Sequence, residues 1–252
     1  MSGLAKSVLY QLKREKLIYG VFLIAVIIGI LQALIGEGME AESLSEFVPV
    51  IGSSLYGFVY MFMGVTVAKI CGSDFDDKTF NYEIMAGHTR RNIYIVRAAV
   101  SIAVVCVASM LAANLPVFTV LIIKGFGTKL SLGSVILRQL LCFFPILRLT
   151  CFYIFLIFIV RNQYIVMGVS YFIFMLSMIL ESLPSHVLAI TNISMLCTYQ
   201  SYSTFSFSGD EYYIYDGSLS INTILFTIII SLALSVFWLI SGYVFYKKDD
   251  LR

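Results

Sequence analysis

The chain has 252 residues, of which 60% are hydrophobic and 13% are charged, and its formal net charge is +2. Soluble domains carry about 25% charged residues, so this composition excludes an ordinary soluble domain and indicates an integral membrane protein. The five cysteines show no CxxC or Cys/His spacing, and there are only two histidines. We therefore expect neither a protein metal site nor structural disulfides.

Six apolar runs are about long enough to cross roughly 30 Å of hydrocarbon. They cover residues 17–35, 47–70, 95–123, 139–160, 164–180 and 221–245. We predict helices, because an open sheet would leave its edges unpaired in lipid and the alternating pattern of a barrel is absent. The predicted fold is an all-α integral membrane protein in which residues 1–252 form a single transmembrane domain.

Lysine and arginine orient these spans. Most of the 17 basic residues lie in the amino-terminal arm, in or beside residues 71–94, at Arg161, or in the carboxyl-terminal tail. Such segments stay in the cytosol, so we expect both termini there. The loop after the first span and residues 181–220 contain acids but no lysine or arginine, which predicts extracellular loops. Lys124, Lys129 and Arg138 in the third loop go against this rule.

Residues 1–16 form a basic amphipathic segment, with Leu4 and Val8 on one side of a helix and Lys6 and Arg14 on the other. This pattern predicts an interfacial elbow helix that steers the first span. The alternative is a basic arm whose only role is to set topology.

A stripe of small residues follows in the first span, where Ala25, Gly29 and Ala33 recur every four residues. Small residues allow helices to approach closely. The stripe is either an intramolecular contact or a candidate dimer interface or translocation path.

Residues 71–97 are the longest charged passage of the chain. Asp76 or Asp77 can cap a short helix in which Phe80 and Ile84 share one face. A helix too short to span needs a partner for its apolar face. In one interpretation the face packs on the bilayer or on the protein's own spans. In the second interpretation it packs on another protein.

The second half of this passage carries stop and start signals. Gly87 can end the short helix, and Thr89 can cap the next one, which begins with Arg90 and Arg91 at the membrane surface.

The run DFDDKTFNYEIMAGHTRRNIYIVR, between the second and third of six spans, resembles the equivalent loop of type-2 ABC transporter permeases, the membrane-spanning subunits of ABC exporters. In that family the loop reads approximately as an acidic residue, Gly-Thr, a short hydrophobic helix, and Gly-x-Ser/Thr-Arg. Thr79 stands at the family's threonine, and Gly87, Thr89 and Arg90 match the second half. Lys78 replaces the usual glycine. The six-span layout extends the resemblance to nearly the whole chain.

The resemblance implies that residues 76–88 form a coupling helix, within a cytosolic coupling loop at 71–94, that docks into a separate nucleotide-binding subunit. Two such ATPase subunits would hold ATP and Mg²⁺, with no cofactor on this chain. A second permease copy or a homologue would complete the transporter, surrounded by membrane lipid and without nucleic acid. The coupling residues implied are Asp76, Asp77, Thr79, Phe80, Tyr82, Glu83, Ile84, Met85, Gly87 and Arg90.

Arg148 is an ionisable residue well inside a predicted span. Its depth, with Pro145 just before it, allows the guanidinium to snorkel to the outer interface. The alternatives are a charge partner such as Glu181, or contact with substrate in a translocation path.

The loop at 181–220 contains an uncharged stretch, residues 185–198, that is too short to cross and predicts a re-entrant or interfacial helix. Its many tyrosines suit an interfacial belt. The resemblance implies an outer gate at this place. The gate candidates are Glu181, Tyr199, Tyr202, Tyr212 and Tyr213.

Other functions fit less well. The chain has no GxxxxGK[ST] motif, so we expect no ATPase site on it and do not expect an enzyme. An intramembrane protease using Ser170 would lack its histidine, and a secondary transporter would need buried carboxylates and repeats. A capture subunit of a vitamin importer and a structural membrane protein stay open. The preferred hypothesis is an exporter of a hydrophobic or cationic amphipathic substrate in the bacterial plasma membrane. An antimicrobial peptide is favoured as substrate, and a lipid or drug is second.

Overall fold

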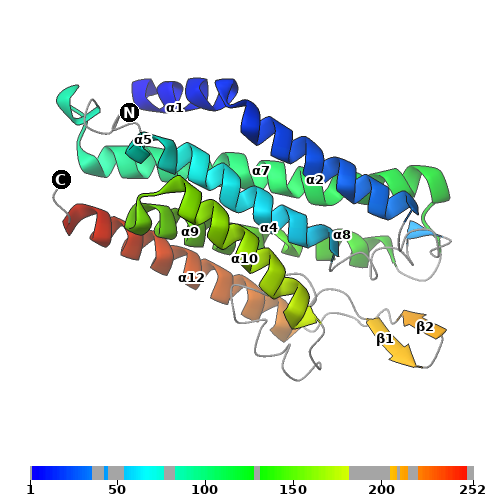
Figure 1. The fold of residues 1–252 in the computed structure, drawn as a ribbon. Coiled ribbons are helices and arrows are strands. Elements are labelled where there is room, and N and C mark those ends of the chain that lie inside the picture. Colours follow the sequence, from blue (N-terminus) through cyan, green and yellow to red (C-terminus); the bar gives the residue numbers. More distant parts are fainter. Residues whose placement is uncertain are drawn as a thin grey trace.

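The structure, a computed structural model, describes residues 2–35, 43–44, 54–76, 83–127, 131–181, 205–208, 211–214 and 221–248. Most of this part of the chain is helical (Figure 1). The helices are α1 (Ser2–Arg14), α2 (Lys16–Ile35), α4 (Ser54–Val67), the π-helix η2 (Ala68–Gly72), α5 (Ser73–Asp76), α7 (Arg90–Lys124), α8 (Leu132–Leu141), α9 (Phe143–Val160), α10 (Gln163–Glu181) and α12 (Ile221–Lys248).

Among the described residues, four helical stretches are long and apolar enough to cross a membrane. They are Lys16–Ile35, Arg90–Lys124, Val135–Val160 and Ile224–Lys247. The predicted spans at 47–70 and 164–180 coincide with shorter apolar pieces, Phe58–Gly72 and Gln163–Leu176. These helices agree with the prediction of a helical, multi-pass membrane protein, and four of the six predicted spans meet the length that a crossing requires.

Helix α9 is the centre of the bundle. It packs against α12, α7, α4 and α10, and Leu149, Tyr153, Ile154 and Ile157 on it are completely buried. A helix that is apolar all round is expected at such a position, because each of its faces meets another helix.

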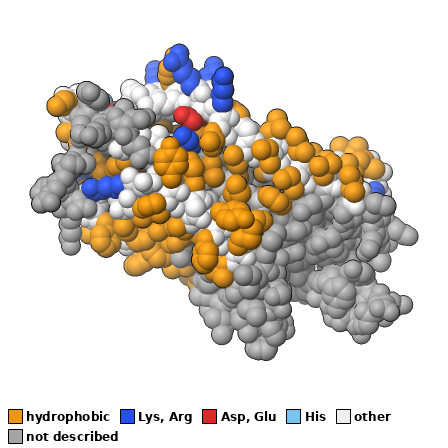
Figure 2. Space-filling model, viewed as in Figure 1, with side chains coloured by type: hydrophobic (Ala, Val, Ile, Leu, Met, Phe, Trp, Pro, Cys, Tyr) orange, Lys and Arg blue, Asp and Glu red, His pale blue; other side chains and the backbone are white. Residues whose placement is uncertain are grey.

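Helices α2 and α12 lie at the outside of the bundle and keep large apolar side chains exposed, such as Leu23 on α2 and Ile229 and Phe237 on α12. In Figure 2 hydrophobic side chains cover much of the face in view, and lysine and arginine gather over α1. A broad apolar surface bordered by basic residues is expected where a protein meets hydrocarbon on one side and headgroups on the other.

The start of α1 and the end of α12 lie at the same end of the bundle as α5 and the beginning of α7 (Figure 1). The first turn of α1, the last turn of α12 and the residues just before α7 therefore share one side of the molecule.

Helix α1 packs on its own bundle. Leu4 and Val8 on the predicted apolar side are buried, whereas Leu9 is exposed, and the helix contacts α7. Its apolar face thus packs into the protein interior. Its last turn carries Lys13 and Arg14, which suit the negative end of the helix dipole.

Two short strands depart from the predicted all-helical architecture. β1 (Phe205–Ser208) pairs antiparallel with β2 (Glu211–Ile214), with Phe205 opposite Ile214 and Ser208 opposite Glu211. The sequence signal for this hairpin is two runs rich in aromatic residues separated by two residues, Gly209 and Asp210.

Candidate functional site

A short helical segment, residues 83–85, precedes α7 at the end of the bundle that carries both chain ends. The segment closes in a Schellman motif. The His88 N–H donates to the Glu83 carbonyl at 3.1 Å, and the Gly87 N–H donates to the Ile84 carbonyl at 3.0 Å. Gly87 has a φ of 88°, a left-handed conformation that suits a residue without Cβ. The prediction that Gly87 stops this helix is confirmed.

Thr89 caps α7, as its position before Arg90 predicts. Its hydroxyl accepts a hydrogen bond from the Asn92 N–H at 3.3 Å, and its backbone is extended. The turn between segment 83–85 and α7 is therefore closed by hydrogen bonds on both sides, by the Schellman motif at Gly87 and by the Thr89 cap.

The three side chains of segment 83–85 face different surroundings. Met85 is 82% exposed, Ile84 is partly buried against the core, and Glu83 turns inward toward α7. Among the described residues of the implied coupling helix, Met85 therefore offers the large apolar side chain that faces outward, beside the small Ala86.

Other residues of the implied coupling helix have different outcomes. Asp77, Thr79, Phe80 and Tyr82 lie outside the described residues. Asp76 is the last residue of α5, so it continues a helix that starts at Ser73, whereas the sequence placed it at a helix start.

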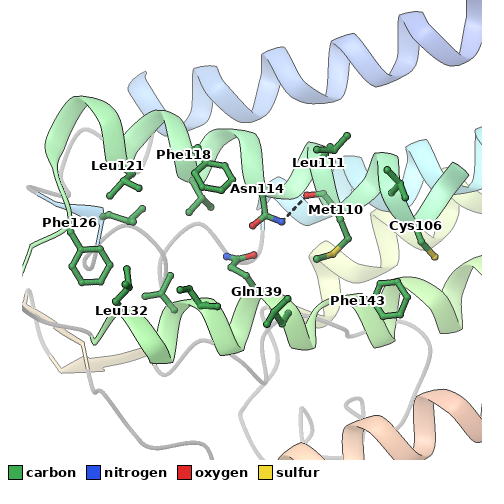
Figure 3. Close-up of a pocket in the computed structure, with 16 residues that line it drawn as sticks. Cys106, Met110, Leu111, Asn114, Phe118, Leu121, Phe126, Leu132, Gln139 and Phe143 are labelled. Carbon is green, nitrogen blue, oxygen red and sulfur yellow. Dashed lines mark hydrogen bonds between the residues drawn. The ribbon is translucent and has the colours of Figure 1, made fainter. Parts of the chain in front are cut away.

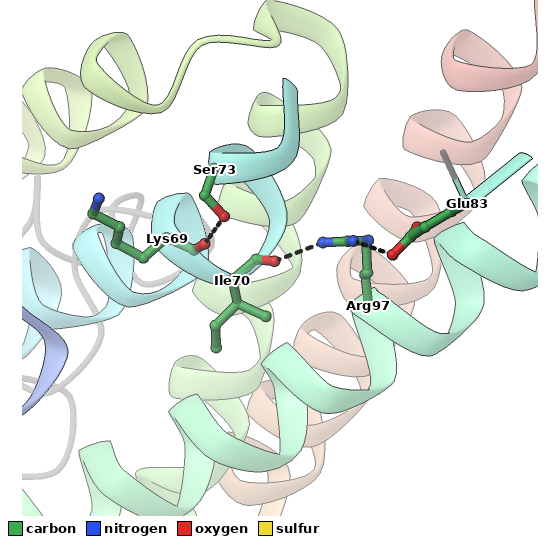
Figure 4. A network of polar contacts seen from close by, with 5 residues as sticks. All are labelled: Lys69, Ile70, Ser73, Glu83 and Arg97. Carbon is green, nitrogen blue, oxygen red and sulfur yellow. Dashed lines mark hydrogen bonds and ion pairs between the residues drawn. The ribbon is translucent and has the colours of Figure 1, made fainter. Parts of the chain in front are cut away.

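Arg97 lies seven residues into α7, and its side chain is completely buried. Its Nη2 donates to Glu83 Oε1 at 2.7 Å, and its Nη1 donates to the Ile70 carbonyl oxygen at 3.2 Å (Figure 4). The pattern of basic residues predicts that Arg97, beside residues 71–94, lies at the cytosolic border of the third span. The structure shows that its side chain is enclosed by protein, so that one guanidinium joins segment 83–85, α7 and the π-helix η2.

The π-helix η2 supplies the carbonyl that Arg97 uses. Wider π turns displace the regular i→i+4 hydrogen bonds and are frequent at functional sites. Here side chains bond two successive carbonyls: Ile70 O accepts from Arg97, and Lys69 O accepts from Ser73 Oγ at 2.8 Å (Figure 4). Gly72 ends η2 where a Cβ would lie 2.7 Å from Ile157 Cδ1 on α9. The π segment is thus held against both α7 and α9.

Burial makes the Glu83–Arg97 pair costly to break. Removing one partner of a buried ion pair leaves an uncompensated charge and costs about 3–5 kcal/mol. The Glu83 side chain is 16% exposed and that of Arg97 is 0% exposed, so water has little access to the pair.

A second contact, between Lys69 and Glu15, links η2 to the junction of α1 and α2. Lys69 Nζ lies 4.0 Å from Glu15 Oε2, and the two side chains are 17% and 38% exposed. An ion pair of this length and exposure contributes about 0–1 kcal/mol. It is therefore a minor connection beside the one made by Arg97.

Aromatic rings fill the interior at the same end of the bundle. Tyr94 on α7 lies 4.6 Å from Phe158 on α9 between ring centroids, and Phe158 lies 5.1 Å from Tyr246 on α12. Phe75 on α5 meets the edge of Phe158 at 5.8 Å, and the Tyr94 hydroxyl donates to the Leu239 carbonyl at 2.7 Å. This cluster connects α5, α7, α9 and α12 at the end of the bundle that contains Arg97.

The small-residue stripe faces the interior. Ala25, Gly29 and Ala33 on α2 are all buried within this one chain, and α2 packs against α7 and α4. Burial inside a single chain fits the intramolecular alternative better than a dimer interface.

Arg148 is also enclosed by the bundle, with 2% of its surface exposed. Snorkelling to the outer interface would leave its side chain exposed, so this position does not fit that interpretation. Glu181, suggested as a charge partner, is the last residue of α10, and its side chain lies outside the described residues.

The gate candidates of the loop at 181–220 are described only in part. Tyr199, Tyr202 and the stretch 185–198 lie outside the described residues. Tyr212 and Tyr213 are neighbours on β2, opposite Phe207 and Ser206 of β1.

An apolar groove of about 600 Å³ opens between the second half of α7 and α8 (Figure 3). Its lining includes Leu44 and runs from Cys106 on α7 to Phe143 at the start of α9, and the described side chains in it are uncharged. Two amides, Asn114 and Gln139, face one another across it (Figure 3). No sequence pattern predicts this groove, because its lining combines residues from two predicted spans, the loop between them and Leu44 in the loop after the first span.

In the described part of the chain, no three His, Cys, Asp or Glu side chains come together as metal ligands would. Comparison with protein-family models, with curated proteins and with solved structures found no match.

Proposed function

We propose that the protein is the membrane-spanning permease subunit of an ABC exporter with six spans, and that both termini and residues 71–94 face the cytosol. A separate ATPase subunit, present in two copies, binds ATP and Mg²⁺ and hydrolyses the nucleotide. A second permease copy or a homologue completes the pathway. The cargo is a hydrophobic or cationic amphipathic molecule, with a peptide as first choice and a lipid or drug as second.

The observation that carries this proposal is the bond between Glu83 and Arg97. It ties a short segment with an exposed apolar side chain, Met85, to a buried arginine in the body of the bundle. A segment that only rests on the membrane surface would need no such connection. A segment that receives force from a soluble partner needs one, because the force must reach the spans.

The contacts of Arg97 give the route for that force. A displacement of segment 83–85 pulls on the guanidinium, which is part of α7 and is also bonded to η2, the continuation of α4. The two helices would then move together as a rigid unit between two arrangements of the bundle. Nucleotide binding in the partner shifts the equilibrium to the extent that the partner binds one arrangement more tightly than the other.

The proposal is tested at Met85. We expect the protein, purified from its own membranes, to carry an ATPase subunit with Mg²⁺-dependent ATP hydrolysis. Met85→Asp should remove this subunit, because a carboxylate in an apolar docking contact is desolvated without a partner. Met85→Leu keeps an apolar side chain of similar size and should retain the subunit. If Met85→Asp retains a fully coupled ATPase, segment 83–85 is not the docking contact.

A further inference from the structure

The groove between α7 and α8 combines an apolar lining with an unpartnered acceptor. Gln139 Oε1 is buried and has no hydrogen-bond partner among the described residues. The amide facing it is already engaged, since Asn114 Nδ2 donates to the Met110 carbonyl on its own helix at 2.7 Å. An amide oxygen without a partner in an apolar environment costs about 1–3 kcal/mol. The site therefore favours an occupant that donates a hydrogen bond to Gln139.

The groove opens on the outer surface of the helices. Val107, Leu111 and Phe118 on α7 and Leu140 on α8 line it and are each more than half exposed. In a membrane this surface faces hydrocarbon, so a molecule dissolved in the bilayer reaches the groove without crossing water. Its volume of about 600 Å³ is within the range of about 300–1,000 Å³ of sites that bind small molecules.

The depth of the two amides matches an amphiphilic occupant. Gln139 precedes Arg161, at the end of α9, by 22 residues, a distance of about 33 Å along a helix. This places Gln139 near the border of a hydrocarbon layer about 30 Å thick, whereas Cys106 and Met110 lie deeper along α7. The polar contact is thus near the headgroups and the apolar lining extends inward.

We propose that this groove binds an uncharged lipid from the bilayer, which places an acyl chain along α7 and donates a hydroxyl or amide hydrogen to Gln139 Oε1. The described residues of the lining are uncharged, so neither a phosphate headgroup nor a cationic peptide finds a charge partner among them, which favours an uncharged occupant. The inference does not depend on the proposed transport function, since it rests on the groove and on its depth in the membrane.

The experiment uses the full chain in phosphatidylcholine vesicles and two photoactivatable probes. One is a diacylglycerol with a diazirine in an acyl chain, and the other is the same molecule with its hydroxyl acetylated, which accepts but does not donate. Mass spectrometry maps the labelled residues. We expect labelling between residues 106 and 143, about threefold stronger for the probe with the free hydroxyl, as for a typical hydrogen bond in a membrane protein.

Two variants locate the contacts of the lipid, and a third serves as the control. Gln139→Met removes the acceptor and should reduce labelling by the hydroxyl probe to the level of the acetylated one. Met110→Trp fills the groove and should reduce labelling by both probes at least threefold, whereas Ile229→Trp, on the exposed face of α12, should leave it unchanged. Equal labelling by both probes in the unmodified protein, or equal labelling of α7, α2 and α12, would overturn the proposal. So would displacement of the probe by a hydrophobic peptide but not by unlabelled diacylglycerol.

Discussion

Glu83 and Arg97 are 14 residues apart in the sequence, and their side chains meet at 2.7 Å in a partly buried contact at the end of the bundle where α7 begins. The contact requires that the chain turn back at Gly87 before α7 begins. The other terminal nitrogen of the same guanidinium donates to the Ile70 carbonyl. One arginine on α7 thus fixes the position of segment 83–85 and also binds the π-helix η2.

The first prediction concerns this arginine. Arg97→Met keeps an unbranched apolar stem but removes the guanidinium, which leaves Glu83 and the Ile70 carbonyl without their donor. We expect a loss of about 3 kcal/mol or more in the free energy of unfolding, measured as a shift of the unfolding midpoint in detergent. Arg91→Met, on the exposed surface of the same helix, should change stability by less than about 0.5 kcal/mol.

A double-mutant cycle separates the pair from its surroundings. With Arg97→Met, Glu83→Gln and the combined variant, we expect a coupling energy between about 0.5 and 3 kcal/mol, as is usual for residues in direct contact. Strict additivity would show that the link between Arg97 and Glu83 contributes no coupling energy, and that Arg97 stabilises the bundle through its other contacts.

The second prediction concerns Gly87. A Cβ added there would meet no atom within 4 Å, yet φ is 88°. Any cost of Gly87→Ala is therefore conformational, and we expect about 1 kcal/mol. Gly20→Ala, in the second turn of α2 with equally open space and ordinary φ, should be neutral or stabilising by up to about 1 kcal/mol. Limited proteolysis between residues 77 and 89 measures the local effect, and equal protection in the two variants would contradict it.

Local signals were sufficient to predict several features from sequence. The apolar runs at 17–35, 95–123 and 221–245 coincide with helices long enough to cross a membrane. Gly87 and Thr89 were predicted as stop and cap because each acts through its own backbone conformation and hydrogen bonds within a few residues. Residues close in the sequence are enough to determine whether such a residue ends or caps a helix.

Features that depend on distant contacts were not predicted. Arg97 lies near the start of an apolar run, where a cytosolic position and a buried one produce the same sequence pattern. Only the approach of Glu83 and of the Ile70 carbonyl distinguishes them. The π turn at Ala68–Gly72 and the groove beside Gln139 likewise arise from the packing of helices that are far apart in the chain.

The third prediction concerns the aromatic cluster behind Arg97. Tyr94→Phe keeps the ring against Phe158 but removes the hydroxyl that donates to the Leu239 carbonyl at 2.7 Å. We expect a loss of about 1 kcal/mol in the free energy of unfolding, the usual net contribution of one hydrogen bond. Tyr164→Phe, whose ring is 68% exposed, is the matched control and should have no measurable effect. A similar change in both variants would mean that the bond to Leu239 does not stabilise the bundle.

The fourth prediction concerns the crossing of α4 and α10. A Cβ on Gly64 would overlap Ser170 Cβ and lie 3.2 Å from Tyr153 Cζ, so the two helices approach as closely as they do only because this residue has no side chain. Gly64→Ala should cost about 1–3 kcal/mol through overpacking. Ser170→Gly on the facing helix removes the overlapping atom, and the double variant should recover most of that loss. Gly168→Ala, two residues away in open space on α10, should not destabilise by overpacking. The prediction fails if the double variant is no more stable than Gly64→Ala, because the loss would then not come from the overlap with Ser170.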